Sequence, residues 1–362
     1  MTESTHRLVL NDATSFAGVP FGAARSVRGE VVFNTGMAGY VETLTDPSYR
    51  GQILVLTYPL QGNYGVPQGP YESGAIQVAG LVVTHYSARP SHHRSVRSLG
   101  NWLESEGVPA LHSVDTRALT RRLRERGTMF GAIEQGDGAR IGGSEWDAPR
   151  RLLEEVVTRD IVTYPAGPMR ILLIDTGAKE NIVRSLVGRG ATVVRSPWNQ
   201  DWEQIIPDVD GIMLSNGPGD PADATSFAMR IRAVLTTDKP IFGICLGHQV
   251  LALAAGARCA KLRYGHRSAN QPVRDLTTGR CYITSQNHGY VVDARSLGDD
   301  WQEWFINLND GTNEGFRHRI RPIRSVQFHP EAAPGPADTG FLFDEFLTQV
   351  AQIKRGETSV AA

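Results

Sequence analysis

The sequence has 362 residues, which is too long for one typical domain and predicts two. Its 37 Lys and Arg residues are balanced by 38 Asp and Glu residues, so charge gives no reason to expect nucleic acid or an anionic membrane as partner. The three cysteines include no CxxC pair, which argues against a disulfide framework or a structural zinc site and predicts the reducing cytoplasm as the compartment.

Residues 1–150 are expected to form an N-terminal domain rich in short strands. Runs of β-branched and aromatic residues predict strands at 31–33, 53–57 and 81–83. One helix is predicted from Asp115, a capping residue, to Gly127, a typical stop. Its arginines form either a partner-binding face or a solvated helix surface (Arg117, Arg121, Arg122, Arg124 and Arg126). No apolar run predicts a signal peptide or a membrane span.

The pattern of predicted secondary structure changes after a predicted linker at 151–168. This linker contains Tyr164-Pro-Ala-Gly-Pro168, which interrupts regular structure. A second domain is expected at 169–354, followed by a tail at 355–362. Within it, strands and helices alternate, with strands at 171–175, 191–195, 211–215 and 240–244, and helices at 179–190, 225–235 and 246–256. This alternation predicts a parallel sheet with helices on both faces, whose ligands bind at the carboxyl ends of the strands.

Cys245 is the candidate nucleophile. It stands in Gly243-Ile-Cys-Leu-Gly247, directly after a predicted buried strand and before a helix, which is the context of a nucleophile elbow. The flanking glycines allow a sharp turn, and a helix N-terminus favours the thiolate over the thiol. Cys259 and Cys281 lack this context, so both are expected to be structural.

A thiol nucleophile needs a base, and the base needs an orienting group. His329 and Glu331 close an apolar strand-like run, and residues i and i+2 of a strand point to the same side, so the two are expected to face one site. The turn SNGPGDP at 215–221 follows another strand, and the backbone amides of Gly217 and Leu246 are candidate oxyanion donors. Taken singly, each feature also fits an ordinary surface side chain or Gly/Pro turn.

Together, GICLGHQ at 243–249, SNGPGDP at 215–221 and FHPE at 328–331 resemble the class I (triad) glutamine amidotransferases over about residues 170–350. Further motifs resemble the carbamoyl-phosphate synthase small-subunit family and extend the resemblance over essentially the whole chain: FNTGMAGY at 33–40, LTDPSY at 44–49, TYPLQGN at 57–63 and QNHG at 286–289. The implied fold class is α/β, with a C-terminal parallel-sheet amidotransferase domain preceded by a smaller, strand-rich α+β domain.

The resemblance implies a Cys245–His329–Glu331 triad that hydrolyses L-glutamine through a glutamyl thioester, with an oxyanion hole at Gly217 and Leu246. It implies that glutamine is contacted by residues of both domains, namely Ser48, Gly217, Gly219, Leu246, Gln249, Asn287, Gly289 and Tyr290. Two neighbouring histidines are expected to be neutral and hydrogen-bonded within the fold (His248 and His288). The chain departs from the usual family residues at Ala13, Ser268, Gln271 and Tyr290, which affects local contacts only.

The chain has no GxxxxGK[ST] loop and no unassigned stretch large enough for an ATP-binding domain. The resemblance therefore implies that ATP and its divalent metal bind a large carbamoyl-phosphate synthase subunit, and that this chain binds no cofactor or metal. A second hypothesis stays open, a catalytically silent docking or regulatory subunit of the same complex. The N-terminal domain argues against a third one, a stand-alone peptidase or a different amidotransferase.

Overall fold

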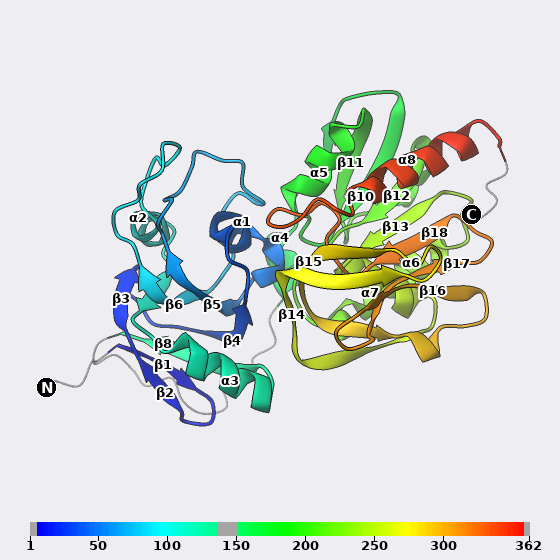
Figure 1. Cartoon of the computed structure of the whole chain (residues 1–362). Coiled ribbons are helices and arrows are strands. Elements are labelled where there is room, and N and C mark those ends of the chain that lie inside the picture. Colours follow the sequence, from blue (N-terminus) through cyan, green and yellow to red (C-terminus); the bar gives the residue numbers. More distant parts are fainter. Residues whose placement is uncertain (1–5, 136–150, 358–362) are drawn as a thin grey trace, which may run out of the picture. The chain divides into compact units, whose positions relative to one another are not determined.

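The computed structural model describes residues 6–135 and 151–357, and the chain divides into two compact units, Met1–Arg151 and Leu152–Ala362 (Figure 1). The predicted linker contains helix α4 (Leu152–Val156) and strand β9 (Val162–Tyr164), both in the second unit. Residues 136–150 of the predicted N-terminal domain and residues 358–362 of the predicted tail lie outside the described residues. Within the described ranges, no helix is long and apolar enough to cross a membrane.

The N-terminal unit is built on one eight-stranded sheet with the order β2-β1-β8-β4-β5-β6-β7-β3. Its strands are β1 (Arg7–Leu10), β2 (Ser15–Ala17), β3 (Val19–Gly22), β4 (Val27–Asn34), β5 (Gln52–Gln61), β6 (Gly80–Tyr86), β7 (Pro109–His112) and β8 (Met129–Glu134). The three predicted strands are confirmed as parts of β4, β5 and β6, which pair in parallel. Helices α1 (Tyr40–Thr45) and α2 (Leu99–Ser105) contribute to the hydrophobic core beside them.

Helix α3 (Thr116–Arg126) confirms the one helix predicted in this unit. The Asp115 carboxylate caps it by accepting a hydrogen bond from the Ala118 amide at 2.9 Å. The helix stops at Gly127, whose φ of 96° is readily available only to glycine. Leu119 and Leu123 are fully buried one turn apart, so the arginines occupy the remaining, outer surface of the helix.

The second unit contains a ten-stranded sheet with the order β15-β14-β16-β17-β18-β13-β12-β10-β11-β9. Its parallel part confirms the predicted alternation, with strands β10 (Met169–Asp175), β11 (Ala191–Pro197), β12 (Gly211–Leu214), β13 (Ile241–Ile244) and β18 (Ile323–Val326). The helices are α5 (Glu180–Val187), α6 (Thr225–Val234), α7 (Leu246–Ala254) and α8 (Phe341–Lys354), drawn around the sheet in Figure 1.

The central parts of the parallel strands are apolar and buried because helices cover both faces of the sheet. On one face, Leu172 and Ile174 pack in a core with side chains of α6 and α7. On the other face, Ile171 and Leu173 pack in a second core with side chains of α5 and α8. The alternation along β10 therefore explains why a continuous apolar run, rather than an apolar–polar one, forms this strand.

An antiparallel extension of this sheet was not predicted from the sequence. It consists of β14 (Arg258–Asp275), β15 (Cys281–Asp293), β16 (Trp301–Asn307) and β17 (Asn313–His318). The long β14–β15 hairpin has two irregularities in its pairing, and its exposed and buried residues do not alternate cleanly. This irregular pattern is why periodicity gave no clear strand signal there.

The expectation that His329 and Glu331 share one face of a strand is wrong. Strand β18 ends at Val326, and the residues that follow form a turn. His329 keeps one strand-like contact, in which its amide donates to the Ser285 carbonyl at 2.9 Å. The turn itself brings the two side chains together. His329 and Glu331 therefore face one site, as expected, but from a turn and not from a strand.

Asp175, at the carboxyl end of β10, ties several loops to the sheet from a fully buried position. Its Oδ1 accepts hydrogen bonds from the amides of Gly177 and Ala178, both at 2.8 Å. Its Oδ2 accepts from the Thr158 amide at 3.0 Å and from Nε of the buried Arg195 at 2.8 Å. The carboxylate therefore satisfies four donors at the edge of the sheet where ligands are expected.

We predict that Asp175→Asn lowers the free energy of unfolding of the second unit by about 3–5 kcal/mol, because it removes one partner of a buried ion pair. Urea unfolding followed by tryptophan fluorescence measures the change. Glu357→Gln, in an exposed ion pair with Arg355, is the control and should unfold like the wild type. Equal stability of Asp175→Asn and the control would contradict the proposed role of Asp175.

Candidate active site

Cys245 occupies a strained backbone position between β13 and α7. Its φ of 53° and ψ of −104° lie outside the regions that ordinary residues prefer, at a cost of about 1–3 kcal/mol. A Cβ on Gly247 would lie 2.4 Å from the Leu214 carbonyl oxygen, and one on Gly243 would lie 2.7 Å from the Gly247 oxygen. Only glycine fits at both positions, so the predicted nucleophile elbow is present.

The turn after β18 holds a chain of three buried charged groups. Nδ1 of His329 donates a hydrogen bond to Oε1 of Glu331 at 2.6 Å. Nζ of Lys179 lies 3.1 Å from the same oxygen and also donates to the Ala332 carbonyl. Asn181 donates to the backbone carbonyl of Glu331, which fixes the turn further. The Glu331 carboxylate is thus shared between an imidazole and an ammonium group.

These contacts set the charge of the two groups that follow β18. Burial opposes a charge on His329, but Glu331 and Cys245 outweigh it and raise the pKa of His329 to about 10. Burial also opposes a charge on Glu331, yet Lys179 and His329 lower the pKa of Glu331 to about 2. At neutral pH the carboxylate is therefore ionised and the imidazole favours its protonated form, which suits a thiolate as neighbour.

The Cys245 thiol lies beside this chain of charges. Cys245 raises the pKa of His329, because its sulfur lies close to the imidazole. Its Sγ donates a long hydrogen bond to the Asn287 carbonyl at 3.8 Å. Nε2 of His329 is buried and has no hydrogen bond of normal length among the described residues. A small rotation of the thiol from the Asn287 carbonyl toward Nε2 completes the sulfur–imidazole–carboxylate arrangement.

The two candidate oxyanion donors are neighbours. A Cβ on Gly217 would lie 2.8 Å from a methyl group of Leu246 and 2.2 Å from the Thr176 carbonyl oxygen, so only glycine lets the loop approach this closely. Leu246 is the first residue of α7, where backbone amides have no acceptor within the helix. The Thr176 hydroxyl donates to the Asn216 carbonyl at 2.9 Å and holds the loop in place.

The residues expected to bind glutamine lie on several elements. Asn287, Gly289 and Tyr290 are on β15, next to the thiol. Gln249, on α7, donates from Nε2 to the Tyr290 carbonyl at 3.0 Å, which links the helix to that strand. Gly219 has a positive φ of 96° in the loop after β12, and Ser48 lies in the N-terminal unit. Their contacts with glutamine stay predictions.

Both neighbouring histidines are hydrogen-bonded within the fold, as expected. Nδ1 of His248 lies 2.9 Å from the Ser325 hydroxyl, and burial lowers the pKa of His248 to about 3. Nδ1 of His288 donates to the Tyr290 carbonyl at 2.8 Å, and burial together with His266 holds the pKa of His288 well below its usual value. Neither ring belongs to the triad.

The four departures from the usual family residues each have a place in the structure. Ala13 adopts a φ of 66°, a region that favours glycine, which explains why Gly is usual there. Gln271 donates from Nε2 to the Ser268 hydroxyl at 2.9 Å, so these two substituted positions interact with each other. The aromatic ring of Tyr290 lies 5.7 Å from the Lys261 ammonium.

Lys179 is the residue of this site that sequence reasoning missed. It follows β10 by four residues, and its amide donates to Oδ1 of Asn216 at 3.0 Å. Since functional residues are expected after strand ends, a lysine in this position was a detectable signal. Nothing in the sequence, however, indicated that its side chain turns inward to a carboxylate far along the chain.

The fold and this site define a class of protein, the cysteine-dependent glutamine amidotransferases. Residues 172–349 match the family model described as glutamine amidotransferase class-I. Residues 8–133 match the model described as the carbamoyl-phosphate synthase small chain, CPSase domain. The chain is 47% identical to the carbamoyl phosphate synthase arginine-specific small chain of Neurospora crassa, over 95% of this chain and 80% of that one. The chain therefore belongs to the carbamoyl phosphate synthase small-chain family.

Other relatives agree with this assignment. The carbamoyl phosphate synthase arginine-specific small chain of Aspergillus oryzae is 46% identical over 97% of this chain and 81% of its own length. The multifunctional protein pyrABCN of Emericella nidulans is 45% identical over 95% of this chain, which corresponds to 17% of that much longer protein. The family thus includes both separate small chains and regions of larger polypeptides.

We predict that Glu331→Gln shifts the alkaline limb of the pH profile for glutamine hydrolysis to lower pH. Glu331 raises the pKa of His329, so its neutralisation should lower that pKa by about 1–3 units. Activity that needs a protonated His329 is then lost at lower pH than in the wild type. The measurement is kcat/KM for glutamate release against pH.

The matched control for this experiment is Glu345→Gln, which removes a carboxylate on α8 that pairs with Arg324. Its pH profile should follow that of the wild type. If Glu331→Gln also kept the wild-type alkaline limb, Glu331 would not set the charge of His329.

Proposed function

We propose that this chain is the glutamine-hydrolysing subunit of a carbamoyl phosphate synthase, with Cys245 as its nucleophile. The observation that carries the proposal is the strained elbow at Cys245 beside the buried His329–Glu331 pair. A strained backbone at a strand–helix junction lowers the stability of the fold. It is typical of sites where it exposes a reactive side chain to the substrate. Cys259 and Cys281 lie on strands β14 and β15 in regular pairing and have no such neighbours.

In the proposed reaction, Nε2 of His329 has accepted the proton of Cys245 before glutamine binds, and the thiolate of this ion pair attacks the side-chain amide carbon of glutamine. The backbone amides of Gly217 and Leu246 stabilise the oxyanion that forms on the amide oxygen. His329 then protonates the leaving nitrogen, which departs as ammonia. Water cleaves the remaining γ-glutamyl thioester and releases glutamate, so Cys245 is restored.

The proposed glutamine site surrounds Cys245. The Asn287 carbonyl of β15 contacts the thiol, Gly289 and Tyr290 follow it on the same strand, and Gln249 holds this strand against α7. Gly219 offers a peptide group in the loop of the oxyanion donor Gly217. Ser48 is proposed to contact the amino-acid end of the substrate from the N-terminal unit. The chemistry needs no cofactor, because the thiolate and fixed backbone donors supply it.

The ammonia is proposed to serve a large ATP-dependent partner subunit, which binds ATP and its divalent metal and makes carbamoyl phosphate from bicarbonate. Free ammonia is mostly protonated in neutral water and is then no nucleophile, so an enclosed path from Cys245 to the partner is required. The N-terminal unit is the proposed docking part, and the exposed arginines Arg117 and Arg121 of α3 suit an acidic partner surface. The proposed compartment is the cytoplasm.

We predict that Cys245→Ala lowers glutamine-driven carbamoyl phosphate synthesis by the complex by at least about 10³-fold and leaves ammonia-driven synthesis unchanged. The loss follows because, among the described residues, Cys245 is the thiol that lies beside the imidazole of His329. Both rates are measured on the purified complex with its large subunit.

Cys281→Ala is the matched control, since Cys281 is exposed and free, and it should keep both activities. A catalytically silent docking subunit predicts a different result: Cys245→Ala would then leave glutamine-driven synthesis as it was. That outcome would contradict the proposed function.

A further inference from the structure

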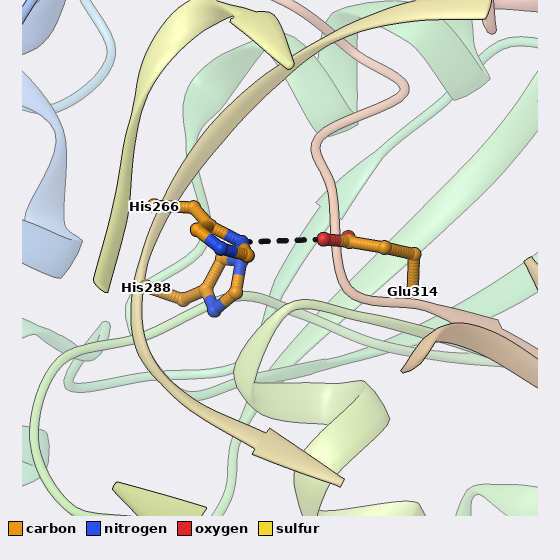
Figure 2. A group of neighbouring side chains, drawn as sticks. All are labelled: His266, His288 and Glu314. Carbon is orange, nitrogen blue, oxygen red and sulfur yellow. Dashed lines mark ion pairs between the residues drawn. The ribbon is translucent and has the colours of Figure 1, made fainter. Parts of the chain in front are cut away.

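A second buried cluster of ionisable side chains lies on the antiparallel extension of the sheet. His266 comes from β14, His288 from β15 and Glu314 from β17. One nitrogen of each ring and one carboxylate oxygen all lie within 4.8 Å of one another, and all three residues are buried. Figure 2 shows the two rings facing the carboxylate. The glutaminase reaction uses none of these side chains.

His266 is oriented by a carboxylate on its outer side. Its Nε2 donates to Oδ2 of Asp310 at 2.9 Å, so in the neutral ring Nδ1 keeps its lone pair. Nδ1 of His266 lies 3.3 Å from Oε1 of Glu314, which is an ion pair when the ring is protonated (Figure 2). The Asn307 side-chain amide donates to the same carboxylate oxygen at 2.9 Å and lies 3.4 Å from Nδ1 of His266, so a cation bound there would displace the ring proton and the Asn307 amide. A carboxylate that binds one ring nitrogen and leaves the other free is the usual arrangement around a metal-binding histidine.

His288 is oriented in the same sense by a backbone group. Its Nδ1 donates to the Tyr290 carbonyl, so Nε2 keeps the lone pair of the neutral ring. Nε2 then faces Oε1 of Gln286 at 3.0 Å, where one acceptor meets another. Oε2 of Glu314 is buried and has no hydrogen bond among the described residues. The cluster therefore gathers two ring nitrogens and a carboxylate that can bind a cation, and one oxygen of that carboxylate is not yet satisfied.

We propose that His266 Nδ1, His288 Nε2 and the Glu314 carboxylate bind a first-row divalent cation of the Zn²⁺ type. Two ligands of a tetrahedral zinc ion at about 2.0–2.1 Å lie about 3.3–3.4 Å apart, which matches the 3.3 Å between His266 Nδ1 and Glu314 Oε1. Two imidazoles, one carboxylate and one water form a common ligand set for zinc. The third ligand, a nitrogen of His288, lies within 4.8 Å of the other two and would move closer when the ion binds.

The proposed cation site lies next to the strand that contacts the Cys245 thiol. His288 stands between Asn287, whose carbonyl accepts from the Cys245 thiol, and Gly289 on β15. A cation held by His288 and by β14 and β17 fixes this strand beside the thiol. It takes no part in the thiol chemistry. This site departs from the sequence-based expectation that the chain binds no metal, which rested on the cysteine spacing and on the family resemblance.

The test is metal binding by the full chain as Cys245→Ala, which removes the thiolate that competes for the same ions. The protein is stripped with a chelator, incubated with Zn²⁺ or Co²⁺, and freed of excess metal. We expect one Zn²⁺ per chain by mass spectrometry of the metal. We also expect a visible Co²⁺ spectrum of a tetrahedral nitrogen–oxygen site without thiolate charge transfer. Failure to bind a stoichiometric ion overturns this site and leaves the proposed glutaminase function untouched.

Variants in the same background locate the ion. Glu314→Gln should abolish stoichiometric binding, and Asp310→Asn should weaken binding by about 10–100-fold, because it removes only the group that orients His266. His318→Asn, at the end of the same strand β17, is the control and should bind like its parent. Zn²⁺ should raise the melting temperature of the parent and of the control but not that of Glu314→Gln. Equal binding by Glu314→Gln and the control overturns the proposal.

Discussion

The buried carboxylate of Glu331 is the charge on which the rest of the candidate active site depends. A buried carboxylate is costly unless it is paired, and Glu331 is paired twice through one oxygen, with His329 at 2.6 Å and with Lys179 at 3.1 Å. Lys179 keeps it ionised and His329 is held protonated in return. The imidazolium is thereby fixed in orientation and charge before any substrate arrives, so it stabilises the neighbouring thiolate and can then protonate the leaving nitrogen.

The parallel sheet is what lets these groups meet. Lys179 follows β10, the oxyanion loop follows β12, Cys245 follows β13 and His329 follows β18, and these four strands are neighbours in the sheet. The carboxyl ends of parallel strands lie at one edge, so segments that are distant in sequence converge there. The strain at Cys245 is tolerated because Gly243 and Gly247 pack directly against the surrounding backbone.

Much of this arrangement was predictable from the sequence. The apolar run of β10 predicted a strand covered on both faces, Asp115 and Gly127 predicted both ends of α3, and the setting of Cys245 predicted the elbow. Three features were not predictable. The His329–Glu331 turn looks like a strand end, Lys179 looks like the first residue of a predicted helix, and the histidines near Glu314 come from separate strands. Each depends on long-range contacts, which local pattern does not encode.

The central claim is that the sulfur of Cys245, and no other thiol, attacks glutamine. Rapid acid quenching of the complex during turnover, followed by peptide mass spectrometry, measures it directly. The account predicts a γ-glutamyl thioester on the peptide that contains Cys245, absent without glutamine. Modification of the Cys259 or Cys281 peptide instead, or turnover with no adduct at any cysteine under conditions that preserve thioesters, would contradict it.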